Sequence, residues 1–117
     1  MLRQNADEIR TYFHPNAYVR WYCTNEHFTV EEFIRANCEY PEEWDGEVER
    51  LICADNEIIT ATHVHTKDNK LSFHVVSFFK IKDGKIVSMD EYWGDDGDAP
   101  KWRQDMKIGR KIKGQSV

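Results

Sequence analysis

The sequence lacks several features that would place it in a particular class of protein. No apolar run approaches the roughly 18 residues that a membrane-spanning helix requires, and residues Met1 to Asn5 contain no apolar core of a signal peptide. Basic residues are outnumbered, with 16 Lys and Arg against 21 Asp and Glu. Because phosphate binding needs a basic face, the net charge of −5 argues against nucleic acid. We therefore expect neither a membrane nor a nucleic acid among the partners.

Cysteine is also scarce. The three cysteines, Cys23, Cys38 and Cys53, form no Cys-x-x-Cys pair, which argues against a zinc knuckle or a redox motif. An odd number of cysteines without a secretory signal indicates free thiols in a reducing compartment, so we expect a cytoplasmic protein. The simplest interpretation of the three residues is as small buried hydrophobic side chains.

What the sequence does contain fits one domain with one core. The chain has 117 residues, of which 40% are apolar and 13% aromatic, so it is neither disordered nor of low complexity. No internal repeat or linker divides it. We expect a single domain over residues 1–117, with a core over about 6–93 and an acidic loop and tail over 94–117.

Two capping patterns predict short helices. Asn5 is followed three residues later by Glu8, which predicts a helix from Ala6 to Phe13 that ends before Pro15. It would place Ile9, Tyr12 and Phe13 on one side. Thr29 and Glu32 form a second such pattern, and the apolar stripe from Val30 to Cys38 predicts a helix stopped at Tyr40-Pro41.

The rest of the chain has the pattern of strands. A first strand is expected over Ala17 to Thr24, rich in Tyr, Val and Trp. Turn residues at 55–56, 67–70 and 83–84 then separate four further candidates, which are Glu47–Ala54, Ile58–Thr66, Leu71–Ile81 and Lys85–Trp93. Consecutive hairpins make an antiparallel meander. The order predicts an α+β fold, a curved antiparallel sheet with helices on one face, followed by a helical turn over 101–106.

One predicted strand is apolar on both faces. Between Phe73 and Phe79, the side chains Phe73, Val75 and Phe79 alternate with Val76 and Phe78. Because a half-solvated sheet alternates apolar and polar residues, both faces of this strand need a cover. A second subunit is the most economical cover, so we expect a homodimer.

Three segments carry a resemblance to a known family. Tyr12 to Ala17 (YFHPNA), Phe79 to Ile86 (FKIKDGKI) and Asp90 to Trp93 (DEYW) resemble the SnoaL-like branch of the nuclear-transport-factor-2-like superfamily. The resemblance implies a cone: a curved sheet wrapped around N-terminal helices, with an apolar pocket inside for a small-molecule ligand. The superfamily includes ketosteroid isomerases, polyketide cyclases, limonene epoxide hydrolase and members that only bind, so the fold narrows the site but not the reaction.

One departure concerns the first helix. The family usually carries a longer helix before the one expected at Ala6 to Phe13, and only five residues stand there. The cone is then open on that side, closed by a partner, or the sequence is a truncated product.

The resemblance also implies a site. The acid of the epoxide hydrolases falls on Glu91, and two of their pocket-lining positions fall on His63 and His65. A carboxyl beside an imidazole suits proton transfer, so these three are the candidate catalytic residues. Exposed strand histidines without any role are the alternative. The expected ligand-binding residues are Val19, Trp21, Phe73, Val75, Met89 and Trp93.

The turn at 67–70 decides the side on which His74 lies, because a change of one residue in the turn reverses every side chain that follows. The family register places Phe73, Val75, Ser77 and Phe79 inside and His74 outside.

Metal binding is the main rival to proton transfer. His63-Val64-His65 has the spacing of a cupin fragment, and His74 and Glu91 could add ligands. A cupin pattern would have a Glu soon after the pair, and residues 66–69 contain none. We therefore expect no metal and no cofactor. Two functions remain: proton transfer, isomerisation or hydration of a small apolar molecule, or a non-catalytic binding or dimerisation module.

Overall fold

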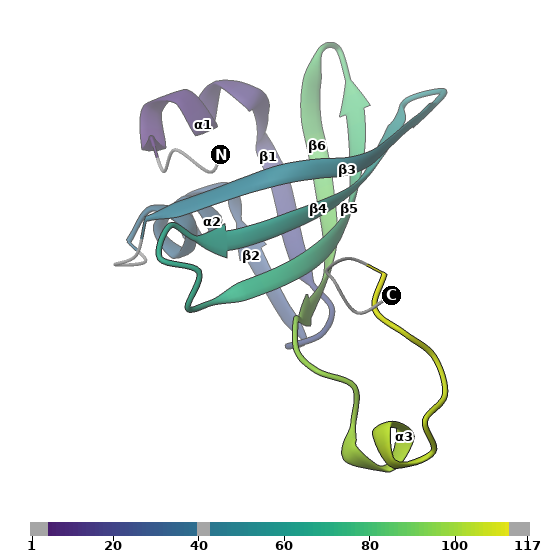
Figure 1. Cartoon of the computed structure of the whole chain (residues 1–117). Coiled ribbons are helices and arrows are strands. Elements are labelled where there is room, and N and C mark those ends of the chain that lie inside the picture. Colours follow the sequence, from purple (N-terminus) through teal and green to yellow (C-terminus); the bar gives the residue numbers. More distant parts are fainter. Residues whose placement is uncertain (1–4, 40–42, 113–117) are drawn as a thin grey trace.

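A six-stranded curved sheet organises the chain in the computed structural model, which describes residues 5–39 and 43–112 (Figure 1). The strands lie in the order β2-β1-β6-β5-β4-β3, and the sheet does not close. This confirms the α+β fold. The elements are α1 (Ala6–Tyr12), β1 (Phe13–Trp21), β2 (Glu26–Thr29), α2 (Val30–Cys38), β3 (Trp44–Ala54), β4 (Glu57–Thr66), β5 (Ser72–Lys82), β6 (Lys85–Asp95) and α3 (Lys101–Asp105).

Both helix caps form as the sequence predicts. The Asn5 side chain accepts a hydrogen bond from the Glu8 backbone N–H at 3.1 Å. Thr29 Oγ1 accepts from the Glu32 N–H at 3.2 Å, and the Glu32 carboxylate accepts from the Thr29 N–H at 2.9 Å. Each cap satisfies N–H groups that a helix end leaves unpaired. The predicted stop at Tyr40-Pro41 lies outside the described residues; α2 itself ends at Cys38.

The junction of α1 and β1 differs from the prediction. Phe13 already has extended backbone angles and begins β1, so the helix ends one residue earlier than expected. Phe13 still reaches the core, at 3% exposed, whereas Tyr12 is 41% exposed. The expected strand over Ala17 to Thr24 therefore begins earlier and ends at Trp21.

A short strand was not predicted. After Trp21 the chain turns at Asn25, which has a φ of +56°, and β2 returns antiparallel to β1. Asparagine tolerates this left-handed conformation better than most residues. The four residues of β2 are too few to show a period of two.

The sheet is mixed and not wholly antiparallel, which corrects the prediction. β1 runs parallel to β6, with Val19 opposite Met89 and Trp21 opposite Glu91, whereas the other neighbours are antiparallel. Between them, Arg20 and Asp90 form an ion pair with an Nε–Oδ1 distance of 2.8 Å. The meander β3-β4-β5-β6 is confirmed.

The core lies between the two N-terminal helices and one face of the sheet. α1 and α2 contribute Ile9, Val30, Phe33 and Ile34. The strands β1 and β6 contribute Phe13, Ala17, Val19, Ile86 and Met89. We call the sheet face that carries Val19 and Met89 the inner face, and the opposite one the outer face.

α3 and the segment before it extend away from the sheet (Figure 1). α3 packs against none of the other described elements. No helix in the described ranges is long and apolar enough to cross a membrane. The cysteines are free thiols, but Cys23 and Cys53 are exposed and only Cys38 is partly buried, so the expectation of three buried cysteines is wrong.

We predict that the capping box is worth measurable stability. Thr29→Ala should lower the free energy of unfolding by about 1 kcal/mol, because it removes the acceptor for the Glu32 N–H. The control is Thr24→Ala, which removes an exposed hydroxyl that donates to the Glu26 carboxylate and should change the free energy by less than about 0.5 kcal/mol. Urea unfolding monitored by tryptophan fluorescence measures both. Equal losses in the two variants would contradict the role of the cap.

Candidate functional site

Strand register brings one carboxyl group to the middle of the inner face. Side chains directly opposite each other on paired strands lie on the same face. Glu91 on β6 is opposite Trp21 on β1 and Ser77 on β5. The next row towards the helices is Val19, Met89 and Phe79. Glu91 therefore lies beside the core, on the face predicted for it.

The Glu91 carboxyl group is buried and hydrogen-bonded through both oxygens. The residue is 7% exposed. Its Oε1 accepts from Trp21 Nε1 at 3.0 Å, and its Oε2 accepts from Ser77 Oγ at 2.5 Å. These donors come from the strands on either side of β6.

Burial raises the pKa of Glu91 above its usual value of 4.5. Loss of water disfavours the charged form, and this effect exceeds the opposing one of the hydrogen bonds from Ser77 and Trp21. Trp93 lowers the pKa least, through a weak interaction of its indole N–H with this carboxyl group. Its Nε1 makes no hydrogen bond of normal geometry among the described residues. A carboxyl group with a raised pKa holds a proton closer to neutral pH, as a general acid or base requires.

Aromatic rings flank this carboxyl along the inner face. The Trp21 ring lies 4.7 Å from Phe28 and 6.2 Å from Trp93, measured between centroids. Trp93 in turn lies 6.0 Å from Phe73, which lies 5.8 Å from Trp44. The row thus extends from β2 to β3. A small molecule bound here would meet rings on several strands and one buried carboxyl.

The expected ligand-binding residues divide into two groups. Val19 and Met89 are 0% and 1% exposed and belong to the core cluster under the helices, which favours a packing role for both. Val75, at 4% exposed, is buried. Trp21, Phe73 and Trp93 are only partly buried, so they retain surface that a ligand could contact.

The two candidate histidines do not join Glu91. In the β4–β5 hairpin, His63 is opposite His74 and His65 is opposite Ser72, whereas Val64 is opposite Phe73. His63 and His65 thus share the outer face with His74, and the expectation that they line the pocket with Glu91 is wrong. The predicted outside position of His74 and inside positions of Phe73, Val75, Ser77 and Phe79 are confirmed.

The length of the turn explains this correction. Thr66 N–H donates to the Leu71 carbonyl at 3.0 Å, so residues 67–70 form the loop that closes the hairpin. Asn69 at φ +61° provides the left-handed residue. With this closure, even positions of β4 share a face with odd positions of β5. Whether His63 or His65 lies on the same face as Glu91 therefore depends on the length of this turn, which the sequence alone does not determine.

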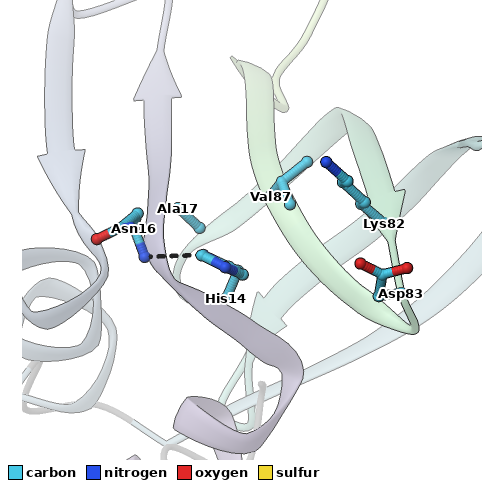
Figure 2. Close-up of a pocket in the computed structure, with 6 residues that line it drawn as sticks. All are labelled: His14, Asn16, Ala17, Lys82, Asp83 and Val87. Carbon is cyan, nitrogen blue, oxygen red and sulfur yellow. Dashed lines mark hydrogen bonds between the residues drawn. The ribbon is translucent and has the colours of Figure 1, made fainter.

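An open cleft that the sequence did not predict lies where β1 begins and the β5–β6 hairpin turns (Figure 2). It encloses about 400 Å³, and within it His14 Nδ1 accepts from the Asn16 N–H at 3.1 Å. Glu91 is not among its lining residues. They are His14, Asn16, Ala17, Lys82, Asp83 and Val87.

Several solved structures share this fold. A candidate ketosteroid isomerase from Kribbella flavida superposes with a TM-score of 0.75 at 18% identity, over 96% of this chain and 82% of that chain. A Catenulispora acidiphila protein with a ketosteroid isomerase-like fold, solved with trimethylamine, gives 0.62 at 11%, over 75% and 74%. An LEH-like epoxide hydrolase from M. tuberculosis gives 0.64 at 10%, over 80% and 73%. At these identities the likeness shows the fold alone.

Sequence comparison gives the family. No curated protein matches the sequence. The family model of the SnoaL-like domain matches residues 1–89, which is most of the chain. The fold, with its curved mixed sheet and N-terminal helices, is that of the nuclear-transport-factor-2-like proteins. The chain belongs to the SnoaL-like domain family.

Proposed function

We propose that the protein binds a small, mostly apolar molecule against the inner face and that Glu91 transfers a proton to or from it. The observation that carries this proposal is the position of Glu91, which is 7% exposed beside partly buried Trp21 and Trp93. Burial raises the pKa of the Glu91 carboxyl group, the direction of shift that general acid–base chemistry by a carboxyl group requires.

The proposed reaction class needs no cofactor. A carboxylate can take a proton from the carbon next to a ketone and, as the acid so formed, return it to another carbon, which moves a double bond. The same group can deliver a proton during hydration. The buried Trp93 indole N–H interacts only weakly with Glu91 and makes no hydrogen bond of normal geometry among the described residues, which makes it a candidate donor to a ligand oxygen.

A non-catalytic binding module is the second candidate. Glu91 already accepts from Trp21 and Ser77, so it also connects β1, β6 and β5 as a structural group would. In this case the aromatic rings bind the small molecule and Glu91 transfers no proton. The family supports both candidates, since its fold carries several activities.

We also propose a homodimer that forms through the outer face, in the cytoplasm. Tyr22, Val76 and Tyr92 are 44%, 38% and 43% exposed, and the Phe78 ring lies 5.9 Å from Tyr92 on the same face. An exposed apolar patch of this kind fits a subunit interface. The free thiols Cys23 and Cys53 are both exposed, which suits a reducing compartment.

Glu91→Gln should abolish catalysed proton transfer. The assay follows exchange of the α-protons of small cyclic ketones for deuterium by NMR. Where the wild type accelerates exchange, Glu91→Gln should lower the rate by about 10²–10⁴, because the amide cannot accept the proton. Glu39→Gln, at the C-cap of α2 with a side chain that is 61% exposed, is the control and should leave the rate unchanged. Wild-type rates in Glu91→Gln would contradict the catalytic proposal, and ketone binding without exchange would favour the binding module.

The burial of Glu91 should also appear in the pH dependence of stability. Its pKa is higher in the folded protein than its usual 4.5, so the folded state binds more protons above that pH. The contribution of Glu91 to the free energy of unfolding therefore falls as pH rises from about 4.5 through the raised pKa. Glu91→Gln lacks this loss, so urea unfolding from pH 4 to pH 8 should show the variant gaining stability relative to the wild type. A constant difference between the two proteins would contradict the raised pKa.

Phe78→Glu should convert the dimer to a monomer or an aggregate, because it places a charge in an apolar interface. The control is Trp102→Glu on α3, which replaces a side chain that is 61% exposed and distant from the sheet. Sedimentation at micromolar concentration measures both. A monomeric wild type would refute the dimer.

A further inference from the structure

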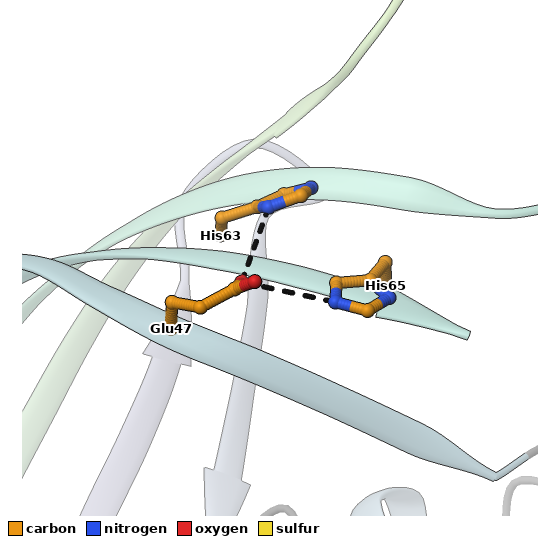
Figure 3. A group of neighbouring side chains, drawn as sticks. All are labelled: Glu47, His63 and His65. Atoms are coloured by element: carbon orange, nitrogen blue, oxygen red, sulfur yellow. Dashed lines mark ion pairs between the residues drawn. The ribbon is translucent and has the colours of Figure 1, made fainter. Parts of the chain in front are cut away.

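Three potential metal ligands meet on the outer face of the sheet (Figure 3). Glu47 on β3 is opposite His63 on β4, and His65 follows two residues later on the same face. Glu47 Oε2 lies 3.2 Å from His63 Nδ1 and 3.7 Å from His65 Nε2. The ligand atoms of the three residues all lie within 4.8 Å of one another.

In each histidine, the ring nitrogen that points away from Glu47 makes a hydrogen bond. This bond determines the tautomer of the neutral ring, and so whether the nitrogen that faces Glu47 carries a proton or a lone pair. His65 Nδ1 lies 3.0 Å from the Thr66 carbonyl oxygen, which can only accept, so Nδ1 carries the proton. The Ser72 hydroxyl donates to Asp96 Oδ2 at 2.5 Å, so it accepts from His63 Nε2–H at 2.8 Å. In the neutral rings, His63 Nδ1 and His65 Nε2 are therefore acceptors.

In the neutral rings, two lone pairs and a carboxylate oxygen are directed at one another, an arrangement that a bound cation stabilises. We propose that Glu47, His63 and His65 bind one divalent transition-metal ion of the zinc type. Imidazole nitrogen and carboxylate oxygen are ligands that Zn²⁺ prefers. Bonds of about 2.0–2.1 Å in a tetrahedron separate ligand atoms by about 3.3 Å, close to the separations of 3.2 and 3.7 Å from the Glu47 oxygen.

Hydrogen bonds from the surroundings orient both histidine rings. Metal-bound histidines usually donate their other N–H to an oxygen, which orients the ring. His63 does so to Ser72, which is held by Asp96, and His65 does so to the Thr66 carbonyl. The Glu47 side chain is 64% exposed, against 27% and 15% for the two histidines, so an ion can reach the three ligand atoms from solvent.

This site is separate from the inner face. Glu91 lies on the other side of the sheet, so the metal site and the proton transfer by Glu91 do not depend on each other. The proposed dimer surface around Val76 and Tyr92 shares the outer face with the metal site. The sequence suggested no metal because no Glu follows the His63–His65 pair. The third ligand precedes the pair, on a neighbouring strand, where a motif read along the chain does not show it.

The first test titrates the full-length protein, freed of metal by a chelator, with Co²⁺ and then with competing Zn²⁺. We expect one ion per chain, the visible absorption of four-coordinate cobalt, and its loss on Zn²⁺ addition. Glu47→Gln and His65→Gln should each weaken binding about 10-fold or more, since even loss of an outer-shell partner costs 10- to 100-fold. His27→Gln, which removes an exposed imidazole on β2, is the matched control and should bind as the wild type does.

The second test observes the rings directly, by long-range ¹H–¹⁵N spectra of the imidazoles. Without metal, His65 should carry its proton on Nδ1 and His63 on Nε2. Added Zn²⁺ should shift the opposite nitrogens, which are Nε2 of His65 and Nδ1 of His63. Spectra that do not change with equimolar Zn²⁺, or Glu47→Gln and His65→Gln variants that bind like the wild type, would overturn the proposal.

Discussion

The buried carboxyl group of Glu91 constrains the arrangement of the central strands. Taking a carboxyl group out of water is costly unless its oxygens accept hydrogen bonds, and here the donors are Trp21 on the parallel neighbour and Ser77 on the antiparallel one. A slip of one residue in either pairing would turn a donor to the other face. The hydrogen bonds of Glu91 therefore form only when β1, β6 and β5 pair in this register.

The sheet separates two kinds of polar chemistry. On the inner face the buried carboxyl group of Glu91 lies among aromatic rings, and burial raises its pKa. On the outer face, histidines and carboxylates are close to solvent, and the His74 pKa is raised because Asp96 accepts a hydrogen bond from its ring. The period of two along each strand produces this division, because neighbouring residues face opposite environments. Trp21 and Arg20 illustrate it: one donates to Glu91 inside and the other pairs with Asp90 outside.

Local chemistry made much of the fold predictable. The Asn5 and Thr29 caps, the turn at Asp83-Gly84 with φ values of +53° and +76°, and the four-strand meander depend on residues close in sequence. The parallel pairing of β1 with β6 was not predictable in this way, since about 70 residues separate Trp21 from Glu91. β2 was missed because it is short.

The candidate site was predictable in part. The inward position of Glu91 followed from the alternation of its own strand together with the family resemblance. The prediction for His63 and His65 depended on the comparison with the epoxide hydrolases, from which this chain departs at both residues. It also depended on the register of the β4–β5 hairpin, which the 67–70 loop sets. That Glu47 lies beside these histidines follows only from the pairing of β3 with β4, which the sequence analysis did not specify residue by residue.

The central claim is that Glu91 is a buried carboxyl group with a raised pKa, and a ¹³C NMR titration of the glutamate side-chain carboxyl carbons tests it most directly. The signal lost in Glu91→Gln identifies the residue. The account predicts that this signal titrates at a pH above the usual 4.5. A midpoint at or below 4.5, as for a solvated carboxylate, would contradict it.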